Sequence, residues 1–402
     1  MRILMVVVPS FILMVPALSP SEKVVLSILV ALVLACSAYM LPRIKRSPFT
    51  LFVAASVVSF GMSIPAGTFE LKSILVFGVT ALIPFALMAH RNTAAIVPMA
   101  IGLCMVLFIP DLMANTLSKL GMFGRDADIT LRSGEIVSRY GGIFGHPFVS
   151  GIISLFAFTF TLVHLPQNRL LAAVLFITCA ILALVNADLA GSRRHVLLIA
   201  ITAGVYIAAR IGLPRLGFLA GLLLVVGVFT YEIGFVGTDE GNLLRAAIWF
   251  RSVETIVDNP LFGLGFVMPA TSVDTFDPND VYVTESFILS VGVWAGVPAL
   301  MTFVFAMMWP VIKATAIRAS LYDRWSIQRY AAYYSLYSAL VLEFFFGGMM
   351  PSLFGAVVLG GLLGVLEPAS RYFPLSVPEH KRRSLLASRP IPRINHETTR
   401  IK

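Results

Sequence analysis

Apolar runs of roughly membrane-spanning length, separated by short polar turns, dominate this sequence. A helix that crosses a bilayer needs about 20 mostly apolar residues. The runs cover residues 3–18, 23–41, 49–65, 72–89, 94–113, 147–165, 169–187, 195–212, 214–231, 285–312, 328–346 and 350–366. They predict an all-α, polytopic membrane bundle of about twelve transmembrane helices. The first run is followed directly by others, so we expect it to remain as an uncleaved helix.

Two longer polar intervals, 111–146 and 231–283, interrupt this pattern and are expected to emerge on the same side of the membrane. The chain therefore divides into six predicted parts: N-terminal transmembrane helices (1–113), a periplasmic loop (114–146), central transmembrane helices (147–231), a large periplasmic loop (232–284), C-terminal transmembrane helices (285–366) and a basic cytoplasmic tail (367–402). No internal repeat is visible, which argues against a transporter built from two similar halves.

The second interval contains an expected amphipathic helix between Arg245 and Asp258, closed by the Asn259-Pro260 pair. Its charged face holds Arg251, Glu254 and Asp258. Its predicted apolar face comprises Ala246, Trp249, Phe250, Val253, Ile256 and Val257. Such a helix is suited to the membrane interface, with its apolar face towards lipid or the bundle.

Composition supports an integral membrane protein, because 58% of the residues are hydrophobic and only 13% are charged. The basic residues predict the orientation, since cytoplasmic loops carry an excess of Lys and Arg. With both termini cytoplasmic, every short inner connection contains a positive charge. The basic tail has the same explanation, so we infer no nucleic-acid partner from the net charge of +9. The cysteines Cys36, Cys104 and Cys179 lie in separate apolar runs and are expected to be buried.

Arginines on the predicted outer side oppose this bias and are the candidates for chemistry. Arg139 begins a segment with Gly142 and Gly145 that ends at His146-Pro147, where proline suits the first turn of a helix. Arg139 is a candidate ligand for an anion. His146 is either a candidate base or a polar residue that only begins the helix.

Arg193 and Arg194, in the run Gly191-Ser192-Arg193-Arg194-His195, lie at the predicted start of a helix. Two cations there oppose the helix dipole, which is a cost that a bound phosphate or diphosphate would offset. Headgroup anchoring or pairing with Asp188 is the alternative explanation.

The large loop adds Arg245 and Arg251 as further candidates for binding a diphosphate. Glu254 and Asp258 follow Arg251 on one face, so an ordinary intrahelical salt bridge also explains that residue. Glu285 is a candidate base at the start of the next helix, although the helix dipole alone favours a carboxylate there. Glu343 lies within a span, where a charge costs about 2 to 3 kcal/mol, and is expected to face the bundle interior.

No Walker motif, clustered Cys/His site or Gly-x-Ser-x-Gly elbow is present, so we expect no metal or nucleotide cofactor.

At these residues the chain resembles the O-antigen polymerase and ligase family of bacterial inner-membrane proteins. Three segments carry the resemblance, and they lie within about residues 135–310: Arg139 to Pro147, Gly191-Ser192-Arg193, and Arg245…Trp249…Asn259-Pro260-Leu261-Phe262-Gly263-Leu264-Gly265. One departure favours a polymerase. The helix after the large loop typically opens with His-Asn in the ligases, whereas Glu285-Ser286 stands in the corresponding place here.

The resemblance implies metal-independent transfer of a glycan from an undecaprenyl diphosphate carrier to an acceptor hydroxyl, at the periplasmic face of the inner membrane. It assigns Arg193, Arg194, Arg245, Arg139 and Arg251 to the diphosphate and Glu285 or His146 to the acceptor proton. The implied product is an exopolysaccharide, capsule or O-antigen, and the implied partners are membrane lipid and the flippase and chain-length regulator of the export pathway. A ligase, a lipid-linked oligosaccharide flippase or exporter, and a non-enzymatic export scaffold are the alternatives.

Overall fold

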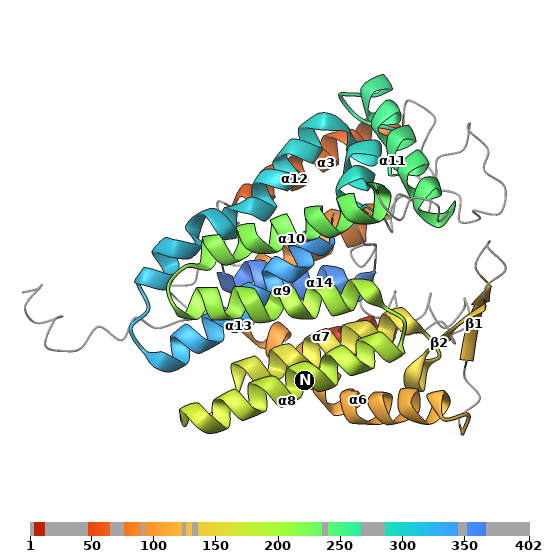
Figure 1. The fold of residues 1–402 in the computed structure, drawn as a ribbon. Helices are drawn as coiled ribbons and strands as arrows, with labels where there is room; N and C mark the ends of the chain where they lie inside the picture. The colour runs from red at the N-terminus through yellow and green to blue at the C-terminus, as the bar shows by residue number, and fades with distance from the viewer. Residues whose placement is uncertain are drawn as a thin grey trace, which may run out of the picture.

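The computed structural model is a bundle of α-helices with one short β-hairpin at one end (Figure 1). It describes residues 4–12, 47–64, 76–89, 93–122, 126–130, 136–234, 240–266, 286–344 and 352–366. The α-helices are α1 (Leu4–Ile12), α3 (Pro48–Ser63), α5 (Ile83–Ala89), α6 (Ile96–Lys119), α7 (Pro147–Val163), α8 (Arg169–Leu189), α9 (Arg193–Arg210), α10 (Pro214–Gly234), α11 (Glu240–Asp258), α12 (Phe287–Ala319), α13 (Arg324–Glu343) and α14 (Leu353–Leu366). The remaining elements are η1 (Gly78–Leu82), η2 (Thr93–Ala95), η3 (Gly142–Phe144), β1 (Asp126–Thr130) and β2 (Ile136–Tyr140). The predicted helical class is confirmed, with the antiparallel β1–β2 hairpin as the exception.

Three of the described helical segments are long and apolar enough to cross a membrane: Thr93–Lys119, Arg169–Leu189 and Phe287–Ala319. The second of these, α8, lies at the edge of the bundle and exposes large apolar side chains such as Leu170 and Ile177. By contrast, α13 is enclosed, and all its residues from Tyr330 to Glu343 are buried. An apolar exterior around a packed interior is the arrangement expected of a bundle in lipid. The predicted run at 23–41 lies outside the described residues.

Helix starts follow local capping chemistry. Ser47 accepts a hydrogen bond from Phe49 N (3.1 Å) beside Pro48, which occupies the first turn of α3. Asn168 caps α8 in the same way. Asp323 caps α13, where its Oδ2 accepts from Ser326 N at 2.8 Å. Because caps and prolines act locally, α3 and α8 begin within one residue of the apolar runs predicted at 49 and 169.

Some predicted boundaries were wrong. Helix α6 continues to Lys119 rather than ending at residue 113, α12 continues to Ala319 rather than ending at residue 312, and α13 begins at Arg324 rather than at residue 328. In each place the helix includes polar residues beyond the apolar run, and hydropathy does not detect these as helical. The expected loop at 114–146 therefore holds the end of α6 and the β1–β2 hairpin.

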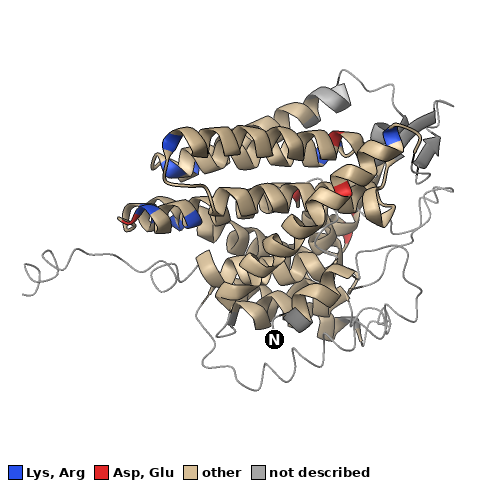
Figure 2. Cartoon of the chain, turned by 90° about the horizontal axis from the view of Figure 1, so that it is seen from below, with Lys and Arg blue, Asp and Glu red and all other residues tan. Residues whose placement is uncertain are grey.

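The two ends of the bundle differ in charge. The described Lys and Arg residues concentrate at the end where α12 connects to α13, while the hairpin and α11 lie at the opposite end (Figures 1 and 2). At the basic end, Arg318 donates to Ala209 O (2.9 Å) and Arg210 O (2.8 Å), so it satisfies carbonyls at the end of α9. Arg215 donates likewise to Ile312 O. The predicted inner connections at Arg210–Arg215 and Lys313–Arg329 thus lie together.

The Asn-Pro-Leu-Phe-Gly turn that follows α11 packs against a break in α12. Gly296 has φ 76° and ψ −179°, which interrupts α12 and frees backbone groups for this contact. Leu264 N donates to Val293 O (2.8 Å), and Val297 N donates to Pro260 O (2.7 Å). These backbone contacts account for the motif structurally, independently of any ligand.

Gly263→Ala is expected to destabilise this junction. Gly263 has φ 63°, and an added Cβ would lie within 2.7 Å of three backbone atoms of Val293, Trp294 and Ala295. The left-handed backbone alone costs about 1 to 2 kcal/mol for alanine. Gly121→Ala is the matched control, because Gly121 has φ 72° with no atom within 4 Å of the added Cβ. Thermal unfolding in detergent should show a larger loss for Gly263→Ala, and equal losses would contradict a role for the close packing.

Candidate functional site

The segment from Arg139 to Pro147, here called the glycine segment, connects strand β2 to helix α7. It folds into the single turn η3, and His146 N donates to Gly141 O at 2.9 Å to close the segment. Pro147 occupies the first turn of α7, as predicted. Since Pro147 has no N–H, α7 begins there with one fewer unsatisfied donor.

A buried carboxylate anchors the glycine segment to helix α6. Asp111 is fully buried and accepts three hydrogen bonds: from Ile143 N (3.1 Å), Ser150 Oγ (3.2 Å) and Asn186 Nδ2 (2.9 Å). The donors come from three different elements, namely η3, α7 and α8. Asp111 therefore joins four parts of the chain at one point.

Two buried carboxamides extend this contact. Asn115 donates to Asn186 Oδ1 (2.8 Å), and its own Oδ1 accepts from Gly142 N (2.7 Å). Asn186 also donates to Ser154 Oγ at 3.0 Å. Gly142 has φ 58°, and a Cβ there would overlap the Asp111 carboxylate. The polar network of Asp111, Asn115 and Asn186 thus requires glycine at position 142.

The second motif, residues 191–195, is here called the arginine turn and connects α8 to α9. Arg193 and Arg194 are the first two residues of α9 and lie at the positive end of its dipole, as predicted. Arg193 is exposed, and within the described residues it makes no ion pair with Asp188. The pairing alternative for Arg193 is therefore wrong. Ser192 does not cap the backbone, and its Oγ instead lies 2.6 Å from Nδ1 of the buried His195.

Phe148 joins the glycine segment to the arginine turn. Its ring packs edge-on against His195 (5.2 Å between centroids) and against His146 (6.3 Å). The Arg194 guanidinium lies 5.0 Å from the centroid of the same ring. A cation over an aromatic face is held by the ring quadrupole, so Arg194 has a defined position beside the glycine segment. Two motifs separated in sequence by helices α7 and α8 therefore form one site.

His146 sits where these two motifs meet. Its Nδ1 is buried and has no hydrogen-bond partner in the described part of the chain. Burial also lowers the pKa of the His146 imidazole below its ordinary value. The neutral form of the ring is therefore favoured, and its buried Nδ1 makes no hydrogen bond to the described part of the chain.

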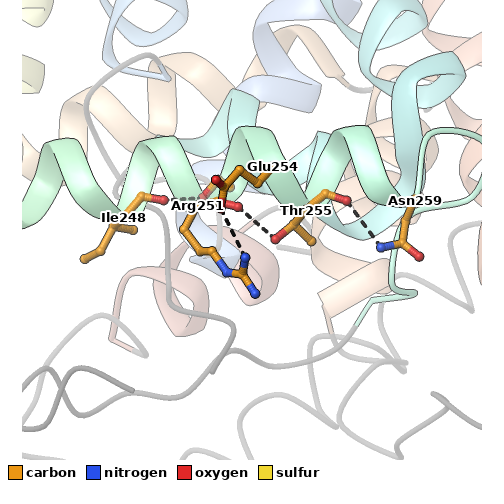
Figure 3. A network of polar contacts seen from close by, with 6 residues as sticks. Ile248, Arg251, Glu254, Thr255 and Asn259 are labelled. Atoms are coloured by element: carbon orange, nitrogen blue, oxygen red, sulfur yellow. Dashed lines mark hydrogen bonds and ion pairs between the residues drawn. The ribbon is translucent and has the colours of Figure 1, made fainter. Parts of the chain in front are cut away.

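Helix α11 lies apart from this site, packed against α10 and α12. Arg251 Nη1 is 3.1 Å from Glu254 Oε2, which confirms the intrahelical salt bridge (Figure 3). Ile248 and Ile256 are buried, whereas Phe250 and Val257 are 68% and 69% exposed. The predicted apolar face is therefore divided: one part packs on the bundle, and Phe250, Val253 and Val257 remain exposed.

For three of the candidate site residues the structure gives no side-chain position. Glu285 lies outside the described residues. For Arg139 the structure describes the backbone, which pairs with Ala127 in the hairpin. For Arg245 it describes the helical backbone within α11. The site that the structure does assemble consists of His146, Phe148, Arg193, Arg194 and His195.

Sequence analysis missed the residues that hold this site together. It began the first polar interval at Asp111 and did not single out Asn186, whereas both residues are fully buried within helices. Their position in the sequence could have indicated this role. A carboxylate or carboxamide within an apolar run is costly in lipid unless it has hydrogen-bond partners inside the bundle. Glu343 is buried at the end of α13, as predicted, and Cys104 is buried while Cys179 is partly exposed.

No protein-family model and no curated protein matches this sequence. Among the described residues, no three His, Cys, Asp or Glu side chains gather in a way that would hold a metal ion.

Proposed function

We propose that this chain is a multi-pass membrane enzyme that transfers a glycan from a polyprenyl diphosphate carrier, undecaprenyl diphosphate, to a hydroxyl of an acceptor repeat unit. The observation that supports the proposal best is the junction of the glycine segment and the arginine turn through Phe148. It presents guanidinium groups, the N-terminus of a helix and a neutral imidazole at one end of an apolar bundle. That combination suits an anionic lipid-linked substrate.

The charge distribution supports the orientation of the proposed enzyme in the bacterial inner membrane. The basic end of the bundle is assigned to the cytoplasm because positively charged loops are retained there. The site lies at the opposite end, beside the hairpin, and is therefore assigned to the periplasm. The proposal includes about twelve spanning helices with both termini inside.

The proposed reaction is a single displacement. The acceptor hydroxyl oxygen attacks the anomeric carbon, the bond from that carbon to the diphosphate oxygen breaks, and the hydroxyl proton passes to a base. Negative charge develops on the departing diphosphate, and Arg193 and Arg194 are positioned at a helix N-terminus to stabilise it. Arg139, Arg245 and Arg251 are proposed as further ligands. Metal independence is part of this proposal through the family resemblance.

The base is proposed to be His146 or Glu285. His146 has the geometry for this role, since its Nδ1 is buried without a partner at the junction. Its lowered pKa keeps the ring unprotonated, which is the form that accepts a proton.

The decisive experiment is the size distribution of lipid-linked and exported glycans in cells lacking this protein. Accumulation of single repeat units on the carrier, with long chains restored by the wild-type gene, would establish a polymerase. Accumulation of long lipid-linked chains would identify a ligase. Unchanged chain lengths would overturn the enzyme proposal in favour of transport or scaffolding.

The pH dependence of transfer separates the two candidate bases. If His146 is the base, activity should fall as the pH drops through a pKa below about 6.5, because protonation removes the accepting form. His146→Gln should then lower the rate and abolish this fall in activity on the acidic side of the pH–rate profile, measured in a reconstituted assay. A fall that persists in His146→Gln would assign the proton transfer to another group, with Glu285 the next residue to replace.

A further inference from the structure

A cavity of about 570 Å³ opens beside the start of α8, the end of α9 and the start of α13, at the opposite ends of α8 and α9 from the arginine turn. It lies between α8 and α9 and is bordered by the first residue of α13. Its wall includes the partly buried Phe176 and the buried Tyr206, while Ile207 and Ile211 are exposed at its edge. A volume of this size is typical of small-ligand sites.

Three arginines line this cavity, one from each of three helices: Arg169 of α8, Arg210 of α9 and Arg324 of α13. No Asp or Glu is among the lining residues that the structure describes. The nearest acid in sequence, Asp323, accepts from Ser326 N and caps α13. The cavity therefore has a positive charge that these lining residues do not neutralise.

The guanidinium groups keep donors for a ligand. Arg210 donates to Tyr206 Oη at 3.3 Å, and Arg324 donates to Gln167 O at 2.8 Å. Each guanidinium has five N–H donors, so one bond each leaves several free. Arg169 is exposed and makes no hydrogen bond or ion pair within the described residues. Three planar guanidinium groups around one opening can each donate paired hydrogen bonds to the oxygens of a phosphate group.

The surface beside the cavity is apolar. On α8, Leu170 is 76% exposed and Val174 is 52% exposed, and Ile177 and Ile181 continue the same surface away from the basic end. This helix is one of those long and apolar enough to cross a membrane. A ligand with a phosphate in the cavity and a hydrocarbon chain along α8 would pair with the arginines and also cover the exposed apolar side chains of α8. The arginines would then lie at headgroup level, where basic pockets between helices bind anionic lipids.

We propose that this cavity binds the headgroup of an anionic phospholipid, with its acyl chains along the exposed face of α8. The bound lipid neutralises Arg169, Arg210 and Arg324 and joins α8 to α9 and α13 at the cytoplasmic end. This inference requires only that the bundle sits in a membrane, and it is independent of the transfer reaction.

Native mass spectrometry of the full chain in detergent tests the site. The probes are cardiolipin, phosphatidylglycerol and phosphatidylcholine with matched acyl chains, undecaprenyl phosphate, and inorganic phosphate alone. Wild-type protein should retain cardiolipin or phosphatidylglycerol at least about tenfold better than phosphatidylcholine, because only the anionic lipids add charge-assisted hydrogen bonds. The triple variant Arg169→Gln, Arg210→Gln, Arg324→Gln should reduce retention to the phosphatidylcholine level.

Lys313→Gln is the matched control, since Lys313 is an exposed cation at the same end that does not line the cavity. It should retain the anionic lipids like wild type. If the triple variant does not fold, Arg169→Gln alone should still weaken retention several-fold, because the Arg169 side chain makes no hydrogen bond or ion pair with the part of the chain that the structure describes. Equal retention of phosphatidylcholine, unchanged retention in the variants, preference for undecaprenyl phosphate, or equally good binding of free phosphate would each overturn the proposal.

Discussion

Replacing Arg193 by Ala is expected to reduce polymer formation at least about a hundredfold, while the protein remains in the membrane at its normal level. Arg193 is exposed at the first position of α9, and its side chain makes no hydrogen bond or ion pair within the described residues that its removal would break. The expected loss comes from the transition state, where the departing diphosphate gains charge that this guanidinium stabilises. Arg193→Lys should recover only part of the activity, because an ammonium group cannot bind two phosphate oxygens in a fork.

Lys119→Ala provides the control for that measurement. Lys119 is an exposed cation at the end of α6, on the same side of the bundle as the arginine turn, and it belongs to neither motif. Its removal should leave the glycan size distribution unchanged. Long chains at normal abundance in the Arg193→Ala strain would refute the assignment of this arginine to the diphosphate.

The second large effect is expected from Asn186→Leu. Asn186 donates to Asp111 and Ser154 and accepts from Asn115, so leucine leaves buried polar groups of Asp111 and Asn115 without that partner. Each such group costs about 1 to 3 kcal/mol, which together amounts to about 2 to 6 kcal/mol. We expect the unfolding temperature in detergent to fall by about 2 to 7 °C. Polymer formation should also be lost, because the network positions the glycine segment.

Ser118→Ala is the matched control for Asn186→Leu. Ser118 is also buried near the end of α6, but its Oγ has no hydrogen-bond partner in the described part of the chain. Removing this hydroxyl should leave the unfolding temperature unchanged or raise it slightly. If Asn186→Leu unfolds at the same temperature as Ser118→Ala, the polar network does not contribute the stability assigned to it.

The contrast between the two candidate arginine groups shows how far local sequence reasoning reaches. The Arg251–Glu254 salt bridge was predictable because residues three apart on a helix are neighbours whatever surrounds them. The contact of Arg194 with Phe148 was not predictable in this way, since it depends on how α7 and α9 approach one another. Sequence alone identified both motifs but offered no geometric reason to join them.

By itself the sequence determined the helical class, the apolar runs, the Arg251–Glu254 salt bridge and the proline start of α7. These features depend on hydropathy, backbone stereochemistry and hydrogen bonds between near neighbours, which act within a few residues.

Only the tertiary structure decided that Asp111 and Asn186 are interior residues, that they fasten the glycine segment to α6 and α8, and that Phe148 connects this segment to the arginine turn. The physical reason is that a buried polar group is tolerated only where distant parts of the chain supply its partners. Its position therefore follows from the packing of whole helices, which no local pattern along the chain records.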